Sequence, residues 1–243
     1  MNTMNRSSSP QMKNPRKHIR PGNVSPILRV DPSIEKPEYL FHDGPEVVTT
    51  SDVKSPEVIE KIRAAGRIAA QALEFAGSMV APGVTTDAID RATHDFIVGK
   101  GAYPSSLEYM GFPKSICTSI NEVICHGIPD DGKKLKKGDI MNLDITVRTA
   151  DGYHGDSSVM FVIGETIQGE RLCRVTQECL YRSIALVRPG ARLSELARAI
   201  QGHAEANGYS VVRDFCGHGI GAGFHEDPQV LHYDGYAPEA DIE

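Results

Sequence analysis

The chain has 243 residues, of which 40% are hydrophobic and 24% charged, an ordinary composition for a globular protein. No run of about 18 apolar residues occurs, which excludes a transmembrane helix, and a formal net charge of −6 argues against a protein that chiefly binds nucleic acid. The five cysteines are scattered without a CxxC pair, and the N-terminus has no apolar signal-peptide core. We therefore expect a cytoplasmic protein that does not enter a membrane.

Residues 1–50 differ in composition from the rest of the chain. They are basic up to Asp31, rich in Ser, Asn and Pro, and have little periodic apolar pattern. Such a composition predicts an extended or disordered N-terminal extension. Three roles remain open for it: contact with an acidic partner such as ribosomal RNA, organelle targeting, or a solvated tail laid over the globular domain.

The globular part is predicted to begin near Ser51 and to continue to residue 243. Ser55-Pro56-Glu57 is typical of a helix start, with a capping hydroxyl, a proline in the first turn and an acid behind it. Apolar periodicity predicts this first helix, a second over 86–100, and later ones over about 169–187 and 193–207. Short β-like runs are predicted at 115–120, 123–125, 140–147 and 153–163.

A weak internal repeat relates the two halves of the chain. A Pro-Gly pair, a helix and a further glycine recur with the same spacing, because Gly83 to Gly101 and Gly190 to Gly208 both span 18 residues. This punctuation is common, but a His-Gly-Ile tripeptide also occurs in both halves and favours a duplicated unit. The repeat predicts a strand pair after the second tripeptide. We expect the chain to end before that pair is complete.

Two carboxylates occupy predicted strands. Asp144 interrupts an otherwise apolar strand pattern, and Asp156 lies in the next strand. The Asp-Gly pair between the strands indicates a hairpin that would make these acids near cross-strand neighbours. Burial of a lone carboxylate is costly, whereas a pair of divalent metals about 3.5–4 Å apart uses bridging carboxylates. The alternative, two ordinary turn or edge-strand acids, stays open at this point.

Three histidines stand in glycine-rich segments next to short strands, namely His126, His218 and His225. Glycine neighbours allow the backbone to approach a ligand or metal closely. One such histidine would be unremarkable as a surface or packed residue. Three together indicate a site.

The motifs resemble type I methionine aminopeptidases over the chain from about residue 35 onwards. The segments that carry the resemblance are 112–115, 117–119, 121–129, 142–144, 152–156, 217–221 and 224–225. The resemblance implies an α+β pita-bread fold, in which a pseudo-twofold repeat forms a curved antiparallel sheet flanked by helices. It also implies a monomer that removes the N-terminal methionine from nascent polypeptides, with possible ribosome contact through the extension.

The resemblance further implies a role for each site residue. Asp144 would chelate one of two divalent metal ions, Asp156 would bridge both, and His218 would be the nitrogen ligand; Co, Mn, Fe and Zn all suit such a site. His126 and His225 would hydrogen-bond the scissile amide and its developing oxyanion. The methionine side chain would enter a slot lined by Tyr109, Phe112, Cys117 and Phe224.

The sequence departs from the family pattern in two places. Asp144 and Asp156 are 12 residues apart, one more than the family spacing, and we expect the extra residue in the turn. The two glutamate ligands of the family have no counterpart in a strand pattern before Glu243. We therefore expect a catalytic domain, residues 51–243, that lacks its C-terminal strands and is weakly active or inactive. Two alternatives remain: a degenerate pita-bread adaptor without catalysis, and a relative of prolidase or creatinase.

Overall fold

The computed structural model describes residues 19–41 and 51–234. The predictions that fall on residues 1–18, 42–50 and 235–243 lie outside the described residues. None of the described helices combines the length and apolarity that crossing a membrane requires.

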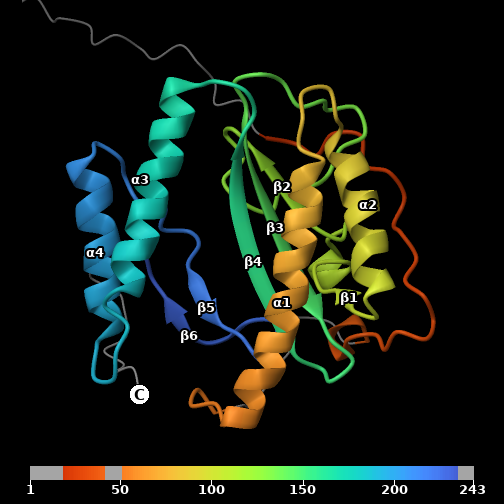
Figure 1. Cartoon of the computed structure of the whole chain (residues 1–243), viewed down its shortest axis with the longest axis horizontal. Helices are drawn as coiled ribbons and strands as arrows, with labels where there is room; N and C mark the ends of the chain where they lie inside the picture. The colour runs from red at the N-terminus through yellow and green to blue at the C-terminus, as the bar shows by residue number, and fades with distance from the viewer. Residues whose placement is uncertain (1–18, 42–50, 235–243) are drawn as a thin grey trace, which may run out of the picture.

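The first half is an antiparallel sheet covered by two helices. Strand β3 (Ile140–Arg148) lies at its centre, pairing with β4 (His154–Val162) along one edge and with β1 (Tyr103–Pro104) and β2 (Cys117–Ile120) along the other. Helices α1 (Pro56–Ser78) and α2 (Thr86–Gly99) cover one face (Figure 1). The main apolar core lies between these helices and the sheet.

Small residues let α1 lie close to the sheet. Its buried face carries Ala65, Ala69, Ala72 and Ala76, and β4 presents Gly155 where the helix crosses. A Cβ atom at Gly155 would lie 2.3 Å from the backbone carbonyl carbon of Ala65. Glycine is therefore required on β4, one residue before Asp156.

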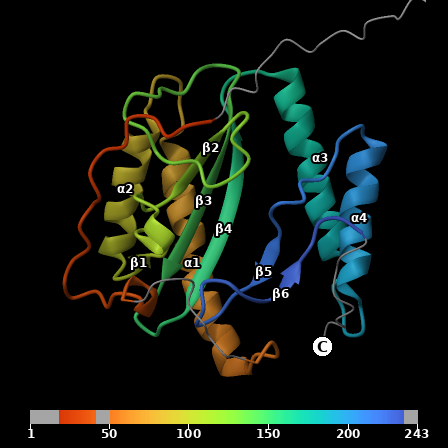
Figure 2. The same ribbon diagram turned by 180° about the vertical axis from the view of Figure 1, so that it is seen from behind.

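Among the described residues, the second half repeats the helix pair but forms a sheet of two short strands. Helices α3 (Ile167–Ile184) and α4 (Leu193–Ala206) pack against each other beyond β4, and the short strands β5 (Gly217–Gly219) and β6 (Glu226–Val230) lie between them and the main sheet (Figures 1 and 2). Helices α2 and α4 both have 14 residues. Each is preceded and followed by a glycine with positive φ, at the positions that the repeat predicted.

One predicted strand is wrong. The residues of 123–125 form no strand, because the chain turns immediately after β2: Asn121 has a φ of 53° and the Val123 amide donates to the Ile120 carbonyl oxygen over 3.1 Å. The short helical turns η1 (Glu38–Leu40) and η2 (Tyr109–Gly111), like β1, β5 and β6, were not predicted. The turns η1 and η2 and the strands β1 and β5 are too short for a periodic pattern. Strand β6 contains Glu, Asp and Pro, which are uncommon in strands.

Residues 19–41, here called the strap, run over the surface beside α2 and the end of β1. Ser25 donates a hydrogen bond to Asp87 on α2 over 2.6 Å, and the Arg29 carbonyl oxygen lies 3.1 Å from His94 Nε2. At its far end, the Tyr39 hydroxyl donates to the Ser105 carbonyl oxygen over 2.6 Å. The strap is thus attached to the domain by named contacts along its length.

Candidate active site

The two predicted carboxylates lie on the same face of the β3–β4 hairpin. In the register, Asp144 is opposite Ser158 and Asp156 is opposite Thr146, so the acids are diagonal neighbours. Pairing runs without a shift from Ile140 to Arg148. The extra residue between the acids therefore falls in the turn, as predicted, and does not disturb the strands.

The carboxylates are coupled to His218, which comes from β5. His218 Nε2 lies 3.6 Å from Asp156 Oδ2. Burial and the nearby Asp156 raise the pKa of Asp144 to about 7. Burial also opposes ionisation of Asp156, but its interactions with His218 and Thr146 outweigh the effect of burial and lower the pKa of that carboxyl. The pairing with Asp156 in turn raises the pKa of His218.

This donor set has the chemistry of a divalent metal site. Two neighbouring half-buried carboxylates repel each other when both are ionised, and a cation between them would remove that repulsion. The single imidazole beside them makes the donor set a mixture of nitrogen and oxygen. The described residues contain no group of three or more His, Cys, Asp or Glu side chains already arranged around one metal position. The donor chemistry fits a metal. In this structure, His218 contacts Asp156 directly, and the donors do not surround one metal position.

His126 is held in a strained loop at the edge of β2. Its φ is 53°, a left-handed value uncommon for a residue other than glycine. The next residue must be glycine, because a Cβ atom at Gly127 would lie 2.2 Å from the Thr118 carbonyl oxygen. The Thr118 amide also donates to the Gly127 carbonyl oxygen over 2.7 Å. Such strain is often stored at functional sites.

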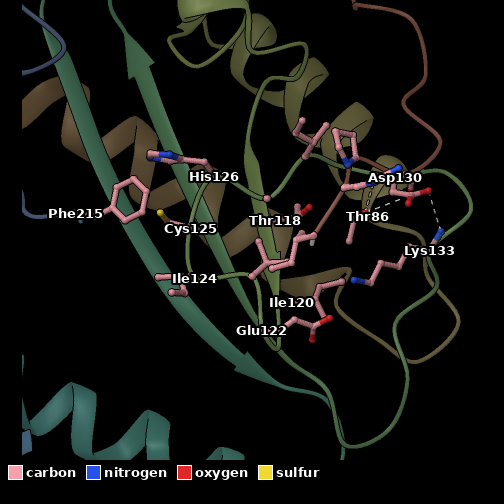
Figure 3. Close-up of a pocket in the computed structure, with 17 residues that line it drawn as sticks. Thr86, Thr118, Ile120, Glu122, Ile124, Cys125, His126, Asp130, Lys133 and Phe215 are labelled. Atoms are coloured by element: carbon pink, nitrogen blue, oxygen red, sulfur yellow. Dashed lines mark hydrogen bonds between the residues drawn. The ribbon is translucent and has the colours of Figure 1, made fainter. Parts of the chain in front are cut away.

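A cavity of about 650 Å³ lies beside this loop. His126 and Phe215 are at one end of it, Thr86, Asp130 and Lys133 are at the other, and Cys125 lies near His126 (Figure 3). The His126 and Phe215 rings meet edge to face with centroids 5.3 Å apart. Strap residues 19–22 also line the cavity, so the strap and the His126 loop both contribute to its wall.

His225 lies between the carboxylates and an aromatic cluster. Its ring centroid is 4.3 Å from that of His218, and its Nδ1 is 3.1 Å from the Tyr109 hydroxyl. Burial of part of the ring, together with the nearby His218, lowers the pKa of His225 to about 4. A neutral ring at this position can both donate and accept hydrogen bonds.

The predicted slot residues are only partly brought together. The Tyr109 and Phe224 rings are 4.8 Å apart, and Cys117, which is opposite Asp144 in the register, is buried beneath the site. Burial and Asp144 raise the pKa of the Cys117 thiol, so it is a neutral, apolar wall. Phe112 is half-buried in the same loop as Tyr109, but its ring makes none of the ring contacts that join the cluster in the described part of the chain.

Sequence reasoning missed the two charged residues that hold the His225 loop, the buried Glu226 and the partly buried Lys54. Glu226 accepts a hydrogen bond from the Gly223 amide over 2.7 Å and pairs with Lys54 Nζ at 2.5 Å. Glu226 directly follows the Phe-His pair, which was a usable signal. Lys54 is 172 residues away in the sequence and gave none.

Comparison with known proteins agrees with this geometry. A model of metallopeptidase family M24 matches residues 60–241. The methionine aminopeptidase of Escherichia coli (strain K12) is 59% identical over 184 residues, which are 75% of this chain and 69% of that protein. The crystal structure of methionine aminopeptidase from Rickettsia prowazekii is similar with a TM-score of 0.75 at 46% identity, over 79% of this chain and 77% of that one.

The prolidase from Pyrococcus horikoshii has a TM-score of 0.64 at 20% identity, over 78% of this chain and 53% of that one, and shares the fold alone. The predicted α+β pita-bread fold, the enzyme class and the resemblance to methionine aminopeptidases are confirmed by these likenesses. The chain therefore belongs to metallopeptidase family M24 and, within it, to the methionine aminopeptidases.

Proposed function

We propose that the chain removes the N-terminal methionine from polypeptides by metal-dependent hydrolysis. The observation that carries the proposal is that His225 contacts both parts of the site. Its ring lies 4.3 Å from His218 of the carboxylate cluster and its Nδ1 lies 3.1 Å from Tyr109 of the aromatic slot. A peptide with its first side chain in the slot would place its first amide bond beside the cluster.

Asp144, Asp156 and His218 would hold the metal, and we propose two divalent ions, with Mn, Fe, Co and Zn all compatible with these donors. When bound, such ions polarise a peptide carbonyl and lower the pKa of water. The carboxylates must be ionised to bind them. Because the pKa of Asp144 is about 7, metal affinity is expected to rise with pH up to neutrality.

The protein's own histidines would handle the scissile amide. With a pKa of about 4, His225 is neutral near pH 7. If the Tyr109 hydroxyl donates to Nδ1, the ring proton is on Nε2 and can be donated to the oxygen of the scissile amide as negative charge develops there. His126, fixed by its left-handed backbone, would hydrogen-bond the same amide group from the β2 side.

The slot would select an unbranched apolar side chain. Tyr109 and Phe224 form its aromatic wall and the neutral Cys117 thiol lies nearby, with Phe112 proposed as a fourth member. Polarizable sulfur and aromatic rings interact favourably. A thioether side chain is therefore expected to bind better than a branched one of similar volume.

The experiment is release of the first residue from Met-Ala-Ser, Leu-Ala-Ser and Ala-Pro by the full chain, with Mn²⁺ or Co²⁺ titrated and Asp156→Asn as the control. We expect methionine release that depends on the added metal and is abolished in the variant, because Asp156 would hold the metals. Release from Ala-Pro alone would replace the proposal with a prolidase activity. No methionine release at any metal concentration would favour an adaptor instead.

The remaining parts of the proposal concern the whole chain. We propose residues 51–243 as the catalytic domain of a cytoplasmic monomer and residues 1–50 as an extension that contacts the ribosome. Support comes from residues 1–30, which contain six Lys or Arg and no Asp or Glu. Cosedimentation of the chain with ribosomes, compared with a variant lacking residues 1–18, tests the contact, and light scattering tests the monomer.

A further inference from the structure

The structure contains a fully buried histidine that the proposed mechanism does not use. His154 begins β4 and has an exposed fraction of 0%. Its Nδ1 lies 2.9 Å from the Ser105 hydroxyl, whereas its Nε2 has no hydrogen-bond partner among the described residues. Leaving a buried polar atom unpaired costs about 1–3 kcal/mol. An apolar side chain of similar size would avoid that cost, so the ring calls for a reason other than stability.

His154 contacts the loop that ends in His225 at two points. Its backbone amide donates to the Gly221 carbonyl oxygen over 2.8 Å. Its ring stacks on Phe224, with centroids 5.4 Å apart and planes at 8°. Phe224 directly precedes His225 and stacks on it in turn, with centroids 4.3 Å apart. The direction of the His225 ring therefore depends on the plane of His154.

The plane of His154 is itself fixed from the opposite side. Ser105 is buried, and its amide donates to the Thr146 carbonyl oxygen on β3 over 2.9 Å. Its carbonyl oxygen accepts the Tyr39 hydroxyl of the strap over 2.6 Å, and the Tyr39 ring lies edge-on to Tyr109 at 5.0 Å. Both aromatic walls of the slot, Tyr109 and Phe224, thus rest on the same support.

We propose that His154 is a positioning residue, which holds Phe224 against the slot and His225 at the scissile amide, with Ser105 and the strap residue Tyr39 fixing its ring. This inference rests on the proposed function for its kinetic consequence, but its structural part does not. A misplacement of about 1 Å in a catalytic group can cost about 100-fold in rate.

Two substitutions separate the two contacts of the ring. His154→Phe keeps a flat ring against Phe224 and loses the Ser105 hydrogen bond. His154→Asn keeps a polar group near the Nδ1 position and loses the stack. His94→Asn is the matched control, because His94 is also buried, also hydrogen-bonded to a serine (Ser115, 2.7 Å), and contacts the strap away from the site.

The kinetic measurement compares Met-Ala-Ser with Leu-Ala-Ser. We expect His154→Asn to lower kcat by about 10- to 100-fold with little change in KM, and to narrow the preference for methionine. His154→Phe should retain most of that preference. His94→Asn should leave both quantities within about twofold when corrected for the folded fraction. If His154→Asn and His94→Asn lower kcat to the same extent and leave the preference for methionine unchanged, the role of His154 is structural only and the proposal is overturned.

A second measurement needs neither activity nor metal. In the chain labelled with 3-fluorotyrosine, the ¹⁹F signal of Tyr109 is assigned by its loss in Tyr109→Phe. We expect His154→Asn to shift or broaden this signal, because Phe224 and Tyr109 share the support, and His94→Asn to leave it unchanged. An unchanged Tyr109 signal in His154→Asn would refute the positioning role. If His154→Asn shifts the Tyr109 signal as expected but the wild-type chain releases no methionine, only the proposed function is refuted.

Discussion

At the scale of single residues, the site depends on backbone shapes that few side chains allow. The His126 backbone is left-handed, with a φ of 53°. A Cβ atom at the next residue, Gly127, would lie 2.2 Å from the carbonyl oxygen of Thr118. The tight loop is what directs His126 away from β2. Its glycine is therefore part of the site although it has no side chain.

Gly127→Ala should move this loop and lower the free energy of unfolding by about 2–4 kcal/mol, through overpacking against backbone that cannot yield. Urea unfolding measures the loss. Gly66→Ala is the control, because a Cβ atom there meets nothing within 4 Å in the middle of α1. It should stabilise the helix by about 0.5–1 kcal/mol. Equal stability in the two variants would contradict the close contact at Gly127.

Asp144 should make the metal-free chain less stable as the pH rises. Its pKa of about 7 is above the ordinary 3.8, so the folded chain keeps a proton that the unfolded chain has lost between these values. The free energy of unfolding therefore falls over that interval. With a chelator present, Asp144→Asn should melt a few degrees higher than wild type at pH 8. The difference in melting temperature should disappear near pH 4. A difference that is the same at both pH values would disprove the raised pKa of Asp144.

At the scale of elements, a buried ion pair attaches the strap to α2. Lys114, with 0% of its side chain exposed, pairs with Asp87 and lies 3.7 Å from Asp90, and it also donates to Ser25 of the strap over 2.5 Å. The two aspartates behave differently. Burial opposes ionisation of Asp87, but hydrogen bonds from Lys114, Ser25 and Arg91 lower its pKa to about 2. Burial raises the pKa of Asp90 to about 6.

Lys114→Met should cost about 3–5 kcal/mol of stability, because it leaves buried carboxylates without their cation. Ser25→Ala should cost only about 1 kcal/mol, yet increase proteolysis within residues 19–41. Arg91→Ala removes a half-exposed partner of Asp87 and should cost less than about 1 kcal/mol. Denaturant unfolding and limited proteolysis check the three variants. Strap protection that survives in Ser25→Ala would show that other contacts hold it.

The elements that sequence could predict are those with a local pattern. The Ser55 cap and apolar period predicted α1, and Asp151-Gly152 predicted the hairpin that makes Asp144 and Asp156 neighbours. The strap contacts and the Lys54–Glu226 pair join residues far apart in the sequence, and no period or motif marks them. His154 lies in the 152–156 motif, but its partners Ser105 and Phe224 are distant in the sequence and could not be predicted. The strand predicted at 123–125 failed because its apolar residues belong to a turn fixed by Asn121.

At the scale of the whole molecule, the two halves share a helix pattern but differ in packing. Fifteen buried apolar residues form the core between α1, α2 and the sheet, whereas three form the core between α3 and α4 among the described residues. His218 and His225 come from the second half, and both aspartates come from the first. The site therefore joins a well-packed half to a less packed one.

This asymmetry predicts two levels of opening in native-state hydrogen exchange. Amides in β3 and α1 should exchange only by global unfolding, whereas those in α3, α4, β5 and β6 should exchange through a smaller opening of lower free energy, because less apolar area holds them. Divalent metal should reduce the difference in opening free energy between the two halves. A metal that joins Asp144 and Asp156 to His218 stabilises only the state in which the halves are in contact. Asp156→Asn is the control in which metal should have no such effect. Uniform protection across both halves would mean that the smaller core is not the weaker one, and that His218 and His225 are held as firmly as the carboxylates they face.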